Sequence, residues 1–127
     1  MKKKITTFSL LFLFAHLLFS NHNNFELVSS AGTMNLNPIN LCLGQTIVVP
    51  HNGDQTLDPD DIIRVVLHDN SGTTLGNITG VQLPINAALS SILSGINFGT
   101  TYYISAIAGM DDGMGNVDLT DSELSVA

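Results

Sequence analysis

The stretch IIRVVLH (residues 62–68) decides the fold class of this chain. It is rich in β-branched residues, and successive side chains of a strand point to opposite faces. Ile63, Val65 and Leu67 are therefore expected to face a core. The other face, which is half polar and is expected to be partly covered, carries Ile62, Arg64, Val66 and His68.

A second clear strand is predicted at TTYYISAIA (residues 100–108). Ile104, Ala106 and Ala108 would point inward, and the opposite face would carry Tyr103 and Ile107. Tyr102 stands at the start of this strand. In immunoglobulin-like sandwiches a tyrosine at the start of the sixth strand folds its hydroxyl back onto a backbone group nearby.

Further short apolar runs lie between turn signals rich in Gly, Asn and Asp. Strands are predicted at 45–49, 73–78 and 117–126, while 81–93 is either an edge strand with a helical turn or two short strands split by Pro84. About six or seven strands in 32–127 are typical of an all-β, immunoglobulin-like or fibronectin type III-like β-sandwich.

The first part of the chain reads as a secretory signal peptide. Three lysines at 2–4 precede an apolar run at 8–19, and polar residues follow it. The run is shorter than the roughly 20 residues of a spanning helix, so no membrane span is expected after cleavage. Cleavage is placed after Ala31, with a cut after Ser20 as the alternative. The predicted division is a leader over 1–31 and one module over 32–127, secreted and extracellular or at the cell surface.

The charge of the mature part is strongly negative. The chain has 4 basic and 11 acidic residues, and three of the basic ones are leader lysines. Cleavage after Ala31 leaves Arg64 against ten acids, a formal charge of −9. Nucleic acid and anionic lipid would repel such a domain. Cys42 is the single cysteine and cannot form an internal disulfide, so we expect it to be a small buried hydrophobe.

The acidic segment after the second strand is the candidate calcium site. In a calcium loop with Gly115 at position 6, Asp112, Asp118 and Asp121 take ligand positions 3, 9 and 12. Positions 1 and 5 fall on methionines, whose thioethers are too soft for calcium. The other interpretation is a solvated hairpin loop whose glycines supply positive φ.

A second acidic cluster is formed by Asp58, Asp60 and Asp61. Asp60 or Asp61 would approach another loop at the same end of the sandwich, or a carboxylate would cap its own turn. Signatures of catalysis are missing from the sequence: it has neither a Gly-x-Ser-x-Gly elbow nor a His-x-x-x-His pair, and it lacks the tryptophan typical of sugar-cleaving sites. We therefore expect a protein that is not an enzyme.

GTTYYISAIAGMDDGMGNVDLTDSELSVA (residues 99–127) resembles a repeat module of large secreted proteins of Bacteroidetes, which often end in gliding-motility-associated or type IX secretion sorting domains. The likeness extends to 41–44, 61–72 and 74–78 and covers nearly all of the mature chain. The resemblance implies a non-catalytic structural or adhesion module, whose partners are neighbouring repeat domains or cell-surface components. A module that binds calcium or glycan through the Asp111–Asp121 loop is the alternative.

Three departures from the family pattern matter. The family has Pro-Cys after the position of Asp121, where this chain has Ser122-Glu123. The disulfide that the resemblance implies for Cys42 is therefore lost, and with it roughly 2–4 kcal/mol. Family sequences also run on past the position of Ala127, and the further repeats and the sorting domain are missing here. The chain is accordingly expected to be a truncated member with an incomplete last strand.

Overall fold

The structure is a computed structural model that describes residues 27–35, 37–40, 42, 46–48, 51–88, 96–97 and 99–127. The described part forms one antiparallel sheet in the order β2-β1-β3-β4. Its strands are β1 (Asp61–His68), β2 (Ile78–Leu83), β3 (Tyr103–Met110) and β4 (Ser125–Val126). These ranges contain no helix, and so none that could cross a membrane. The prediction of an all-β chain is confirmed for the described residues, while the apolar run at 8–19 lies outside them.

Strands β1 and β3 form the centre of the sheet. They pair without a break from Asp61↔Met110 to His68↔Tyr103. Both were predicted from β-branched and alternating residues, although β3 begins at Tyr103 rather than at residue 100. Tyr102 precedes β3, and its hydroxyl accepts a hydrogen bond from the Asn97 backbone N–H at 3.0 Å. The predicted fold-back of the tyrosine hydroxyl is confirmed.

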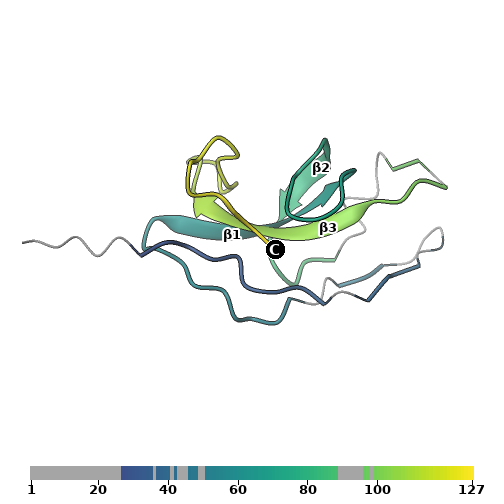
Figure 1. Ribbon diagram of the computed structural model, residues 1–127, viewed down its shortest axis with the longest axis horizontal. Helices are drawn as coiled ribbons and strands as arrows, with labels where there is room; N and C mark the ends of the chain where they lie inside the picture. The colour runs from purple at the N-terminus through teal and green to yellow at the C-terminus, as the bar shows by residue number, and fades with distance from the viewer. Residues whose placement is uncertain are drawn as a thin grey trace, which may run out of the picture.

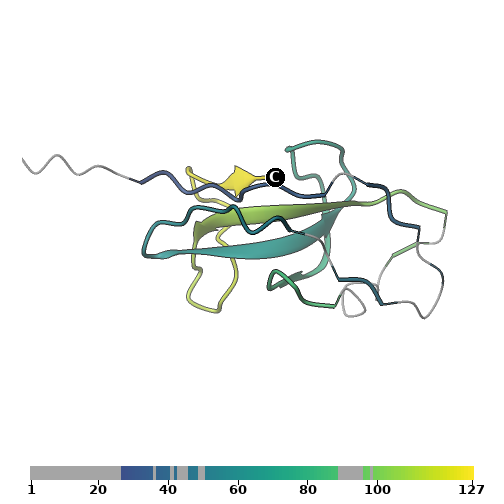
Figure 2. The ribbon, with the colours of Figure 1, turned by 90° about the horizontal axis from the view of Figure 1, so that it is seen from below.

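One side of the sheet, here called the inner face, is covered by the chain that precedes β1 and by the turn that follows β2. Figure 1 shows this chain running beneath β1 and β3, and Figure 2 shows it from below. Isolated bridges join its segments at Ser30↔Thr56 and Met34↔His51. The inner face has the predicted composition and carries Ile63, Val65, Leu67, Ile104, Ala106 and Ala108.

The opposite side, here called the outer face, is covered by two loops, at 69–77 and 111–124. Val66 and Ile107 are 0% exposed and pack with Val117 and Leu124. His68 is also 0% exposed. The sequence predicted partial cover of this face, and the cover proves complete at these positions because both loops fold back over the sheet (Figure 1).

Two predicted strands are wrong. Residues 73–77 belong to a loop, because the Asp69 carboxylate accepts the Asn77 N–H at 2.7 Å and its side-chain amide at 2.8 Å and so closes the chain there. Of 117–126, Ser125–Val126 alone is a strand. Within 81–93, β2 is an edge strand that ends at Leu83, and a turn with Asn86 at φ 72° follows. Residues 89–93 lie outside the described part.

The packed unit includes residues upstream of the expected boundary at Gly32. Ala31 is 0% exposed and its N–H donates to Ser125 Oγ at 3.0 Å. Ser29 Oγ accepts the Asp58 N–H at 2.8 Å. Cleavage after Ser20 would keep these contacts, and cleavage after Ala31 would remove them.

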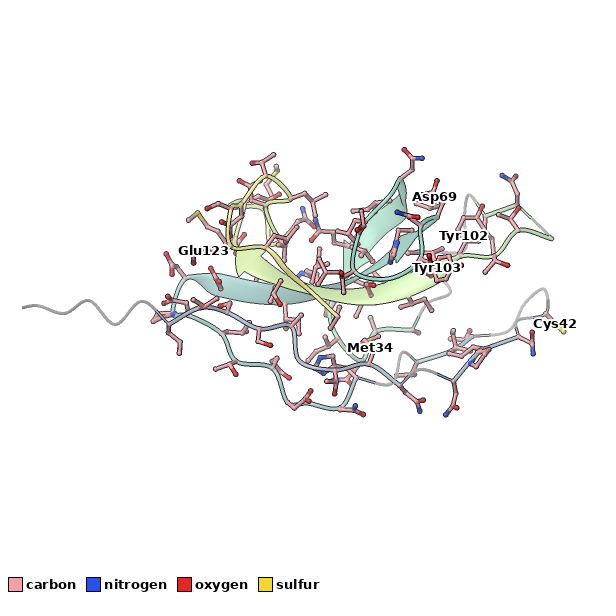
Figure 3. The ribbon with its side chains drawn as sticks, viewed as in Figure 1. Met34, Cys42, Asp69, Tyr102, Tyr103 and Glu123 are labelled. Carbon is pink, nitrogen blue, oxygen red and sulfur yellow. The ribbon has the colours of Figure 1, made fainter. Side chains whose placement is uncertain are left out.

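The expectation of a buried Cys42 is wrong. Its side chain is exposed. Figure 3 shows it at the end of the molecule opposite to Glu123, pointing outward. Cys42 is exposed because the chain carries it to the end of the molecule, away from the centre of the sheet (Figure 3).

Candidate functional site

The acidic loop that follows β3 is held together by its own carboxylates. Asp111 Oδ1 accepts the N–H groups of Gly113 at 2.9 Å and Gly115 at 3.0 Å. Both glycines have positive φ, 80° and 82°, which other residues adopt at a cost. The bridge Asp111↔Val117 and the positive φ of these glycines agree with the hairpin loop that the sequence offered as one interpretation.

The three predicted calcium ligands each bond within a turn or to the adjoining strand. Asp112 Oδ1 accepts the N–H groups of Met114 at 2.8 Å and Asn116 at 3.0 Å. Asp118 Oδ1 accepts both the N–H and the hydroxyl of Thr120, at 2.8 and 2.7 Å. Asp121 takes its bonds from the Met110 N–H and the Glu123 N–H, each at 3.0 Å. Among the described residues, no group of three or more His, Cys, Asp or Glu is arranged to hold a metal ion.

These hydrogen bonds also set the acidity of the loop. Backbone N–H donation from Asn116, and then from Met114, holds the pKa of the Asp112 carboxyl below its ordinary value. The N–H of Met110, followed by that of Glu123, does the same for the pKa of Asp121. Because bonds to the charged form favour it, both carboxylates stay ionised well below neutral pH.

Arg64 and Gln82 fasten the acidic loop to the sheet, and the sequence did not single out this role for either. Arg64 Nε donates to the Gly115 carbonyl at 2.7 Å. Gln82 Nε2 donates to the Val117 carbonyl at 2.9 Å, and its Oε1 accepts the Val117 N–H at 2.7 Å. The Gln82 side-chain amide thus pairs with Val117 much as a neighbouring strand would.

A shallow hollow of about 300 Å³ lies beside this loop, at the end of the sheet where β1 begins and β3 ends. The Asp60 carbonyl accepts the Asp111 N–H at 3.4 Å, so the backbones of the two acidic segments meet at one end of the sheet, which is one of the two alternatives that the sequence left open. The hollow is lined by Asp58, Asp60, Asp61, Met110, Asp121, Ser122 and Glu123. Its negative charge would attract cations and repel anionic ligands.

A second polar group lies inside the sheet. His68 Nε2 and Ser105 Oγ are 2.9 Å apart, and Ser105 is 5% exposed. His68 Nδ1 has no hydrogen-bond partner among the described residues. Burial lowers the pKa of His68, and the nearby Asp69 charge opposes that shift. The pair packs beside the Tyr103 ring, 6.0 Å from the imidazole, where bulk solvent does not reach the histidine.

Comparisons with known proteins find no relative: no family model matches the chain, and neither curated proteins nor solved structures contain a match. The case for a function therefore rests on the sequence and on the geometry of the described residues.

Proposed function

We propose that this chain is a non-catalytic, extracellular β-sandwich module that serves as a structural or adhesion unit of a secreted or cell-surface bacterial protein. The observation that carries the proposal is the arrangement of the sheet. In immunoglobulin-like sandwiches, strands C′, C, F and G are neighbours in that order. The order β2-β1-β3-β4, with Tyr102 bonded back at the start of β3, has the same pattern.

The layer beneath the inner face supplies the second half of the proposed sandwich. Its segments pair with one another at Ser30↔Thr56, Met34↔His51 and Val48↔Ala88. Met34, Ile47, Leu57 and Ile85 from this layer pack against the inner face. Two layers that bury a common core are the standard solution for such a module.

The placement of the described charged groups supports a mechanical role. Asp111, Asp112, Asp118 and Asp121 accept hydrogen bonds that shape their own loops, and Arg64 anchors one of these loops. A stiff module of this kind would hold neighbouring domains or binding loops away from the cell surface. The leader and the resemblance to Bacteroidetes repeat modules support a location outside the cell, with neighbouring repeats and cell-surface components as partners.

The rival is a module that binds calcium or glycan through the Asp111–Asp121 region. What favours it is the meeting of two acidic segments around one hollow. Calorimetric titration of the full chain with calcium separates the structural proposal from the calcium form of the rival. A structural module gives no heat of binding, whereas the rival gives micromolar binding that is lost in Asp118→Ala and kept in Asp69→Ala, the same change at the far end of the sheet.

Export is tested by expressing the full chain in a bacterium that secretes proteins. The proposal predicts the chain in the medium or on the cell surface, with an amino terminus created by cleavage between Ser20 and Gly32. Retention of the uncleaved chain in the cytoplasm would contradict the extracellular assignment.

A further inference from the structure

We propose that Asn52 is a self-modification site, at which the backbone nitrogen of Gly53 attacks the Asn52 side-chain amide with His51 as the base. Asn52-Gly53 is the one Asn-Gly pair in the sequence. Both residues are exposed, in the turn that follows residues 46–48. The products are a cyclic imide and, after hydrolysis, aspartate or isoaspartate.

The base is already in contact with the attacking nitrogen. An amide nitrogen becomes a useful nucleophile when it loses its proton, and the Gly53 N–H donates to His51 Nδ1 at 2.9 Å. The other ring nitrogen, Nε2, lies 2.6 Å from the Ala31 carbonyl, which can only accept. The proton of the neutral ring is therefore on Nε2, and the lone pair of Nδ1 faces Gly53.

The leaving nitrogen is also held in place. Asn52 Nδ2 donates to Thr33 Oγ1 at 2.7 Å, and this hydroxyl donates to Asp54 Oδ2 at 2.7 Å. The Asn52 side chain is thus oriented through Nδ2, the nitrogen that leaves as ammonia. The hydrogen bonds run from this nitrogen through the Thr33 hydroxyl to the Asp54 carboxylate. Preorganisation of this kind removes part of the entropic barrier to ring closure.

Gly53 leaves room for the ring to form. Its φ is 75°, and apart from its own atoms and those of its two chain neighbours, nothing lies within 4 Å of the position that a Cβ would occupy. A side chain at this position would crowd the closing ring and hinder the approach of water. The open surface instead admits the water that the second step needs.

In the first step, His51 Nδ1 takes the proton of the Gly53 N–H as a bond forms between Gly53 N and Asn52 Cγ. The Cγ–Nδ2 bond then breaks, and Nδ2 leaves as ammonia with the proton returned by the imidazolium. In the second step, water adds to either carbonyl of the imide. Opening on one side gives aspartate, and opening on the other gives isoaspartate, whose side-chain carbon has entered the backbone.

The modification would loosen the layer over the inner face. It removes the Nδ2 donor to Thr33 and places a second carboxylate next to the one of Asp54. The bridge Met34↔His51 lies directly beside this turn, and Met34 packs against Val65 and Leu67. Deamidation of Asn52 in the secreted protein would thus weaken the packing of the layer that covers the inner face.

The experiment follows the full natural chain at neutral pH by mass spectrometry of its peptides. Asn52 should lose ammonia about tenfold or more faster in the folded chain than in guanidinium chloride, since a positioned general base contributes on the order of a hundredfold or more in enzymes. In folded His51→Gln the rate should fall to that of the denatured chain. Asn70, exposed and followed by Ser71, is the internal control and should show no such dependence on His51.

Equal or slower loss of ammonia from Asn52 in the folded natural chain than in the denatured one would overturn the proposal. So would an unchanged rate in a folded His51→Gln protein. Circular dichroism reports whether that variant folds. If it does not, the comparison of folded and denatured natural chain decides the matter.

Discussion

The central side chains on the two faces of the sheet are equally inaccessible to solvent, but different interactions exclude the solvent on each face. On the inner face, Val65 is 1% exposed beneath apolar residues from distant segments. On the outer face, Ile107 is 0% exposed beneath loops that polar side chains hold in place, among them Arg64 and Gln82. Both covers exclude water with apolar side chains, but those of the outer face, Val117 and Leu124 among them, lie on a loop that hydrogen bonds hold in place. They should differ in how they fail.

The largest expected loss of stability comes from truncating one core side chain on each face to alanine. Ile107→Ala on the outer face and Leu67→Ala on the inner face should each lower the free energy of unfolding by about 2–5 kcal/mol, through lost burial and the cavity left behind. Urea titration measures both. A loss below about 1 kcal/mol for Ile107→Ala would mean that the outer loops do not seal the sheet in solution.

Removal of residues upstream of Gly32 tests the inner face alone. A chain that begins at Gly32 loses the bond from Asp58 N–H to Ser29 Oγ, the two bonds between Ser30 and Thr56, and the burial of Ala31. At about 0.5–1.5 kcal/mol for each hydrogen bond, we expect it to be about 2–4 kcal/mol less stable than a chain that begins at Asn21. Equal urea midpoints for the two chains would place the boundary at Gly32 after all.

Gln82→Leu tests the hydrogen-bonded cover of the outer face. The change leaves the N–H and carbonyl of Val117, a residue 2% exposed, without their partner. Unpaired buried polar groups cost about 1–3 kcal/mol, so a loss of that size in thermal or urea unfolding is expected. Gln55→Leu is the matched control and should be nearly neutral, because Gln55 Oε1 has no partner among the described residues.

The smallest expected effect is a dependence of the free energy of unfolding on pH, which arises from His68 on the outer face. Burial lowers the pKa of His68 in the folded state, so the unfolded chain binds a proton first, near its ordinary value of about 6.5. Stability should therefore fall as the pH drops below about 6.5, and His68→Gln should remove this decrease. The urea midpoint, measured from about pH 7.5 to 4.5, reports it.

The exposed carboxylates affect stability in a lower pH range than His68 does. The pKa of Asp112 and that of Asp121 are depressed in the folded state, so their contribution is present at neutral pH and is lost as the pH falls through those lowered values. A decrease that persists above pH 4.5 in His68→Gln would point to a group other than His68.

The sequence predicted the strands correctly where the alternation of side chains within one strand defines them. It failed where side chains bond to the backbone and replace the hydrogen bonds between strands. Alternation identified β1 and β3 and the residues of the inner face. It failed at 73–77 and 117–124, because Asp69, Asp118 and Asp121 bond to backbone groups nearby and turn the chain away from a strand. The calcium-loop spacing selected Asp112, Asp118 and Asp121 as ligands, but spacing carries no information on which N–H groups a carboxylate accepts.

By itself, the sequence determined that β1 and β3 are strands and which of their side chains share a face, because the two-residue period is a property of each strand alone. Tertiary structure alone decided that the centre of the outer face is covered, that His68 is buried, and that Ser29 and Ala31 belong to the packed unit. These outcomes depend on pairs that lie far apart in the chain, such as Arg64 with Gly115 and Ala31 with Ser125. No local pattern specifies such pairs, since each is formed only when the sheet brings its two members together.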